Sequence, residues 1–135
     1  MEDFVTYEQS VKLKELGFDW KCNHYYDTSE LINECTDSNI SNYNNFNGTS
    51  FIEEISSAPT LAQAAKWLRT KIDIYVEIFY EKIDIDKKIV DTWRTTINKM
   101  STYYAETLME KFHSHEEALS AGIDKALKII EDEQF

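Results

Sequence analysis

Glycine and proline are scarce in this chain. Its 135 residues include three glycines and one proline, so most of the chain is expected to form regular secondary structure. No window approaches the ~18 consecutive apolar residues of a membrane span. The first ten residues, MEDFVTYEQS, have neither the basic region nor the apolar run of a signal peptide. The sequence therefore predicts a cytoplasmic protein.

Cysteine and histidine are also rare. Cys22 and Cys35 are the only cysteines and neither belongs to a CxxC pair, which favours free thiols in a reducing compartment. His113 and His115 lie two residues apart, just before or at the start of the predicted last helix, and we do not interpret them as a chelating pair. His24 lies two residues after Cys22, but surface or capping roles fit the histidines better than a zinc site. No metal or other cofactor is predicted.

Basic residues are outnumbered by acidic ones. The chain has 14 Lys and Arg against 25 Asp and Glu, which gives a net charge of −11. This charge disfavours binding to phosphate backbones and to anionic membranes, because both depend on basic side chains. It fits a protein partner or a homo-oligomer. As an alternative, it fits an acidic mimic of nucleic acid.

Catalytic motifs are missing as well. No serine lies in a nucleophile elbow, and Cys22 and His24 lack a third group that would orient them as a catalytic couple. Asp84 and Asp86, in KIDIDKK, lack the further oxygen ligands of a calcium loop, so we interpret them as solvated turn charges. The sequence predicts no enzyme and no catalytic or metal-binding residue.

The clearest pattern is a helix that leads directly into a strand between Ser57 and Tyr80. Thr60 and Gln63 have the spacing of a capping box at the start of the helix. Its apolar stripe consists of Leu61, Ala64, Ala65 and Leu68. From Ile72 the apolar period changes from 3.6 to 2, which predicts a strand with one buried face.

Shorter elements precede this helix. A capped helix is predicted from Thr6 to Gly17, and residues 22–27 are an aromatic strand candidate. Residues 36–50 are polar and rich in asparagine, and we interpret them as a long hairpin loop with its turn at Asn47-Gly48. Residues 49–55 are expected to return as a strand.

The C-terminal half continues the sheet. We expect residues 82–88 to form a charged connection. We expect residues 89–98 to form a strand that pairs antiparallel with the strand that begins at Ile72. Tyr103 and Tyr104 favour an extra strand, although the residues after them favour helix. A capping box at Ser114 predicts the last helix. Its apolar stripe includes a glycine, Gly122, so we expect close approach of helix and sheet.

Together these elements predict one α+β domain over residues 1–135. Three helices are expected on a mainly antiparallel sheet of four or five strands. The predicted order is α-β-β-α-β-β-(β)-α.

Three segments resemble a known group of proteins. They read TYEQSVKLKELGFDW, SAPTLAQAAKWLRTK and HEEALSAGIDKALKII, and together they cover about a third of the chain. They resemble small uncharacterised proteins of gut anaerobes and their bacteriophages. The resemblance implies a small cytoplasmic α+β protein, borne by a phage or prophage, and brings no catalytic residues.

Aromatic residues are abundant, with eight Tyr, seven Phe and three Trp. They either pack beneath the helices or form a binding surface, since Tyr and Trp are enriched at interfaces. An exposed sheet face with Tyr75, Phe79 and Arg94 can grip a partner or stack a base. The full set of candidate binding residues is Lys66, Trp67, Arg69, Tyr75, Phe79, Trp93, Arg94, Tyr103 and Tyr104.

Non-enzymatic binding is the function that we expect. The chain would be an accessory protein, such as a phage anti-defence factor, that acts on a host component through a protein–protein contact. A second hypothesis is a sponge for a nucleotide-like signalling molecule. Its stacking residues would be Trp67, Trp93 or Tyr104, and its phosphate contacts would be Lys66, Arg69 or Arg94.

Overall fold

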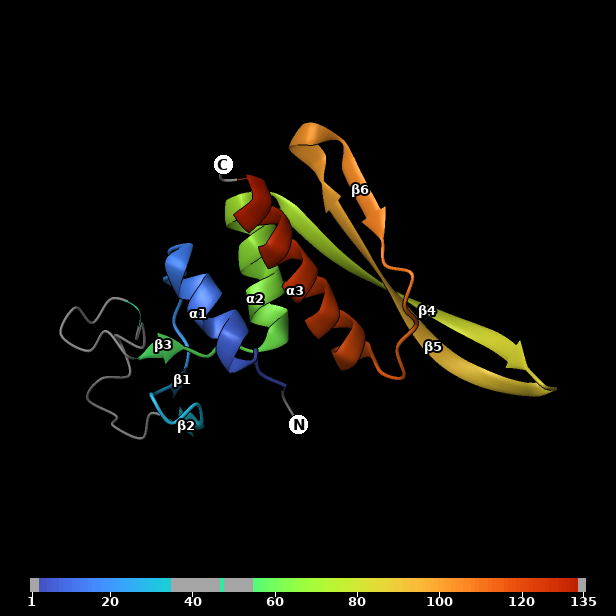
Figure 1. The fold of residues 1–135 in the computed structure, drawn as a ribbon, viewed down its shortest axis with the longest axis horizontal. Helices are drawn as coiled ribbons and strands as arrows, with labels where there is room; N and C mark the ends of the chain where they lie inside the picture. Colours follow the sequence, from blue (N-terminus) through green and yellow to red (C-terminus); the bar gives the residue numbers. More distant parts are fainter. Residues whose placement is uncertain (1–2, 35–46, 48–54, 134–135) are drawn as a thin grey trace. The chain divides into compact units, whose positions relative to one another are not determined.

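The chain forms two compact units, residues 1–64 and residues 65–135. Figure 1 labels their helices and strands. The computed structural model describes residues 3–34, residue 47 and residues 55–133. The α+β class and the three α-helices are confirmed. The single sheet of four or five strands is wrong, because the described strands form two separate three-stranded antiparallel sheets.

The first unit contains helix α1 (Tyr7–Glu15) and a small sheet of order β2-β1-β3. Its strands are β1 (His24–Tyr26), β2 (Ile32–Glu34) and β3 (Ser56–Ser57). The capping box of α1 is confirmed. The Thr6 N–H donates to Gln9 Oε1 at 2.9 Å, and the Gln9 N–H donates to Thr6 Oγ1 at 3.1 Å.

The strand prediction was less accurate in this unit. Strand β2 was not predicted. Strand β3 is Ser56–Ser57, which directly follows the predicted strand at 49–55, and residues 49–54 of that prediction lie outside the described residues. The predicted loop at 36–50 also lies outside them, apart from Asn47. The Asn47 side chain donates to the Phe18 carbonyl at 2.8 Å and accepts from the Ser57 N–H at 2.9 Å.

Helix α2 (Leu61–Trp67) begins in the first unit and ends in the second. The Thr60 cap is confirmed, because Thr60 Oγ1 accepts from the Gln63 N–H at 3.1 Å. The Gln63 side chain does not complete a capping box and instead donates to the Lys21 carbonyl. The helix does not lead directly into a strand. A π-helical turn, Leu68–Ile72, and the left-handed residue Asp73 (φ 64°) come first.

The second unit contains a long hairpin. Strand β4 (Ile74–Ile85) pairs with β5 (Lys88–Lys99) in an unbroken one-to-one register. The predicted connection at 82–88 is therefore wrong. Residues 82–85 alternate polar and apolar side chains like the rest of β4. The turn is only Asp86 and Lys87, and their φ angles of 51° and 66° suit the right-handed twist of a tight hairpin.

A third strand extends the inner half of this sheet. The extra strand predicted near Tyr103 is present as β6 (Tyr104–Thr107), after a 3₁₀ turn, and it pairs with the end of β5. Further along β5, Trp93 and Phe112 exchange two backbone hydrogen bonds of 3.0 and 2.9 Å. The order of the sheet is β4-β5-β6, so β4 is an edge strand.

Helix α3 (His115–Glu133) packs on the inner half of the hairpin. Its predicted cap is present, since Ser114 Oγ accepts from the Glu117 N–H at 3.1 Å. The close approach at Gly122 is confirmed, because a Cβ atom there would lie 2.4 Å from Val76 Cγ1 and 2.7 Å from Thr95 Cγ2. None of the described helices combines the length and apolar character that crossing a membrane requires.

Candidate binding face of the long hairpin

The hairpin has two faces, which its register defines. The face covered by α3 at its inner end, the helix face, carries Ile74, Val76, Ile78, Tyr80, Lys82 and Asp84 of β4 and Ile89, Asp91, Trp93, Thr95, Ile97 and Lys99 of β5. The opposite face, the open face, carries Tyr75, Glu77, Phe79, Glu81, Ile83 and Ile85 of β4 and Lys88, Val90, Thr92, Arg94, Thr96 and Asn98 of β5. This alternation follows from the two-residue period of a strand.

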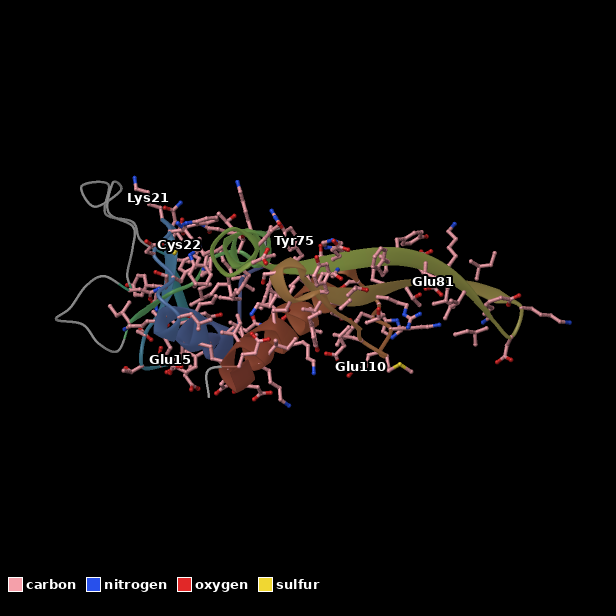
Figure 2. The ribbon with its side chains drawn as sticks, turned by 90° about the horizontal axis from the view of Figure 1, so that it is seen from above. Glu15, Lys21, Cys22, Tyr75, Glu81 and Glu110 are labelled. Carbon is pink, nitrogen blue, oxygen red and sulfur yellow. The ribbon has the colours of Figure 1, made fainter. Side chains whose placement is uncertain are left out.

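The outer half of the hairpin, here called the arm, projects beyond helix α3 (Figure 1). In Figure 2, Tyr75 lies near the inner end of β4 and Glu81 lies farther along the arm. Large apolar side chains remain in contact with solvent there. Phe79 is 50% exposed, Tyr80 53%, Ile85 51% and Ile89 74%. A two-stranded hairpin gains little stability by itself in water, so this apolar surface is typical of a site that a partner covers.

Three of the predicted binding residues share the open face. Tyr75 is half-buried, Phe79 is exposed, and Arg94 is the direct cross-strand partner of Phe79. The Arg94 Nε atom is buried and has no hydrogen-bond partner among the described residues. An unpaired buried donor is unfavourable, so an acceptor from a partner that reaches the guanidinium would stabilise the complex.

Trp93 lies on the other side of the hairpin. It is half-buried on the helix face, and its ring packs edge-on against Tyr80 with centroids 5.4 Å apart. The Tyr80 hydroxyl donates to Asp91 Oδ1 at 2.5 Å, and this hydrogen bond raises the pKa of Tyr80. The hairpin therefore places Trp93 and its neighbour Arg94 on opposite faces, so they cannot hold one flat ligand together.

The three candidate residues in α2 and in the π-helical turn after it differ in exposure. Lys66 and Arg69 are exposed. Trp67 is only 3% exposed. A nucleobase cannot stack on an indole that is buried to this degree unless the helix moves, which disfavours Trp67 as a stacking residue.

The remaining candidates are two adjacent tyrosines with different environments. Tyr103 has a positive φ angle of 54° and is 97% exposed. Tyr104 opens β6, and its hydroxyl donates to the Glu106 carboxylate. That hydrogen bond raises the pKa of Tyr104 to about 12 and lowers the pKa of Glu106.

This hydrogen bond predicts a high-pH titration. Between the ordinary pKa of 10.0 and the folded value of about 12, the unfolded chain loses the Tyr104 proton while the folded chain keeps it. The stabilising contribution of Tyr104 is therefore complete below pH 10 and is lost as the pH rises toward 12. The tyrosinate absorbance of the wild type minus that of Tyr104→Phe should show a midpoint near 12. A midpoint near 10 would contradict the hydrogen bond, and Glu106→Gln is expected to shift the midpoint in that direction.

The residues considered for catalysis or metal binding, Cys22, His24, Asp84 and Asp86, do not form a catalytic arrangement. Cys22 is buried, which raises the pKa of its thiol, and its Sγ lies 3.5 Å from the His24 backbone carbonyl. The His24 ring packs on Phe4 instead, with centroids 4.3 Å apart. Asp84 lies within strand β4 and Asp86 in the turn. Within the described ranges, no three His, Cys, Asp or Glu side chains gather as a metal site.

Sequence reasoning missed the outer part of the arm. Ile83 and Ile85 add apolar side chains to the open face, and Tyr80 and Ile89 expose apolar surface on the other face. KIDI alternates with the two-residue period of a strand, but its isoleucines lie on the open face, whereas Ile74, Val76 and Ile78 lie on the helix face. The high charge of this segment favoured a loop interpretation instead.

Comparison with known proteins adds no assignment. A scan of protein-family models and searches of curated proteins and of solved structures found no match to this chain.

Proposed function

We propose that this chain is a non-enzymatic binding protein whose partner is a protein, and that the open face of the hairpin is its docking surface. The observation that carries this proposal is the exposure of Phe79 and Ile85 on a projecting arm. Large aromatic side chains with Arg beside them dominate many protein interfaces energetically. The matching partner surface would supply an apolar pocket for Phe79 and a carboxylate or carbonyl oxygen for Arg94.

The resemblance to proteins of gut anaerobes and their phages supports a more specific setting. In that setting the chain is a phage or prophage accessory protein in the host cytoplasm, and it acts on a host component. The small-molecule sponge has less support, because Trp67 is buried and Trp93 and Arg94 lie on opposite faces. The acidic nucleic-acid mimic also has less support, because the projecting hairpin carries as many basic as acidic residues.

Substitutions on the open face test this proposal. The wild-type chain is used to capture a protein from an extract of its host, and that protein is then purified and titrated against variants. Phe79→Ser and Arg94→Gln are each expected to weaken binding by roughly 10-fold or more, as expected for the central residues of an interface. Since Phe79 is half exposed, circular dichroism should show an unchanged fold for Phe79→Ser.

Tyr103→Ala provides the matched control. Tyr103 is a more exposed aromatic residue, but it lies in the β5–β6 connection and outside the open face. This control variant should bind like the wild type. If both open-face variants bind with wild-type affinity, or if all three variants are equally impaired, the open face is not the docking surface.

A further inference from the structure

Strand β4 has a long edge that is unpaired in the described sheet. β4 has 12 residues, pairs on one side only in the described sheet, and keeps its register without a bulge. It contains no proline, and its outer half from Phe79 onward remains exposed or half-buried. Proteins commonly blunt such edges with short strands, bulges, proline or charge, because an open edge pairs readily with another strand. Of these devices β4 has only charge, at Glu77, Glu81, Lys82 and Asp84.

The backbone groups on this edge can be assigned from the turn. In a two-residue hairpin the residues that flank the turn, here Ile85 and Lys88, exchange hydrogen bonds with each other. Every second residue of β4 therefore bonds to β5, and the residues between them direct their N–H and C=O groups outward. These outward residues are Ile74, Val76, Ile78, Tyr80, Lys82 and Asp84.

The charge of the hairpin favours a second copy of the chain as the occupant of this edge. Its five acidic residues are Glu77, Glu81, Asp84, Asp86 and Asp91, and its five basic residues are Lys82, Lys87, Lys88, Arg94 and Lys99. The hairpin thus has no net charge, and the whole net charge of −11 lies elsewhere in the chain. Two copies can therefore meet through their hairpins with less repulsion than through other parts of the chain.

The pairing register can be deduced from the charges of β4. Two antiparallel arrangements pair β4 of one copy with β4 of the other along almost its whole length. In both of them, outward residues lie opposite outward residues. An arrangement centred on Phe79 sets Glu77 opposite Glu81 of the other copy, twice by symmetry, and like charges in direct opposition are destabilising. An arrangement centred on Tyr80 sets each glutamate of the strand opposite an apolar residue, with Glu81 facing Phe79 and Glu77 facing Ile83.

We propose that two copies of this chain form a symmetric dimer by antiparallel pairing of their β4 edges, with the two-fold axis at Tyr80. Pairing the same edge of both copies closes the assembly at two. The other free edge in the described sheet, that of β6, has only four residues and competes poorly. This dimer goes beyond the proposed function, since it uses the strand edge and does not depend on any partner at the open face.

Cysteine cross-linking tests the register of the dimer. Directly opposite residues that exchange hydrogen bonds have Cα atoms about 5.5 Å apart, within the range of a disulfide, whereas diagonal neighbours are about 7–8 Å apart. Under oxidised glutathione, Tyr80→Cys should form a covalent dimer, and Phe79→Cys should form little. Mass spectrometry of the digest should find the link between two peptides that contain position 80. Preferential cross-linking of Phe79→Cys would overturn the proposal.

A second measurement, the molar mass by light scattering, tests the edge itself. The wild type should have twice the monomer mass at micromolar concentration, and a monomer there would overturn the proposal. Lys82→Pro removes an outward N–H that forms no bond to β5, so it should give a folded monomer. Lys82→Thr removes the same charge but keeps the N–H, and it should remain a dimer. A Lys82→Pro variant that still dimerises would also overturn the proposal. Arg94→Gln, the docking-face variant on β5, should keep the dimer mass. Failure at the open face can thus be distinguished from failure at the β4 edge.

Discussion

Replacing Phe18 by alanine is expected to lower the free energy of unfolding by about 3 to 5 kcal/mol, the usual cost of removing a fully buried phenylalanine. Phe18 is 1% exposed and lies three residues after the end of α1. Its N–H donates to the Leu13 carbonyl at 3.0 Å, and its ring centroid lies 6.5 Å from that of Trp20. The loss would be a large fraction of the 5 to 15 kcal/mol that typically stabilises a domain. Urea denaturation followed by tryptophan fluorescence measures it.

A conservative variant separates burial from other effects at this position. Phe18→Leu keeps a large apolar side chain in the same place and is expected to cost less than about 1.5 kcal/mol. If Phe18→Ala is no more destabilising than Phe18→Leu, then Phe18 does not contribute to the core in the way that its burial indicates.

Replacing Gly122 by alanine is the second large effect. Alanine is a better helix former than glycine by about 1 kcal/mol, so an exposed position would gain stability. At Gly122 the added Cβ would lie 2.4 Å from Val76 Cγ1, and the methyl groups of Val76 and Thr95 belong to β-branched side chains with little rotamer freedom. We therefore expect a net loss of about 1 to 3 kcal/mol, as for an overpacked core, measured in the same urea denaturation.

Lys128→Ala serves as the control for helix propensity. Lys128 is an exposed residue of α3, and surface substitutions of this kind usually change stability by less than about 0.5 kcal/mol. A stabilised Gly122→Ala variant would show that α3 can move away from the hairpin at no cost, which would contradict the close packing.

These two substitutions also test the prediction of a single domain. Phe18 lies in the first unit and Gly122 in the second. If both units unfold together, each variant shifts one common transition and lowers the hydrogen-exchange protection of both units. If they unfold separately, the Phe18 variant affects only the first unit and the Gly122 variant affects only the second.

Local signals were predicted well from the sequence. The capping box at Thr6 and the caps at Thr60 and Ser114 each depend on residues three apart, so the sequence contains all the information that the contact requires. Pairing between distant strands is different. No feature of Ser56–Ser57 shows that these two residues join a sheet with β1, and the division into two sheets depends on such long-range choices.

The candidate face was partly predictable, because its alternation within β4 is also a local pattern. The two-residue period places Tyr75 and Phe79 on one face of β4, and the register then sets Arg94 opposite Phe79. The length of the arm was not predicted. Asp86 and Lys87 adopt positive φ angles that favour glycine or asparagine, so the turn lacked its usual sequence signature. Whether these residues bind a partner stays a prediction.

The uneven distribution of charge along the chain has a kinetic consequence. The hairpin is neutral, whereas the chain has a net charge of −11. The electrostatic repulsion between two approaching copies is therefore smallest when their hairpins face each other. Added salt should therefore speed the encounter of two copies, because it screens the acidic remainder, while it leaves the rate of dissociation of the paired strands nearly unchanged.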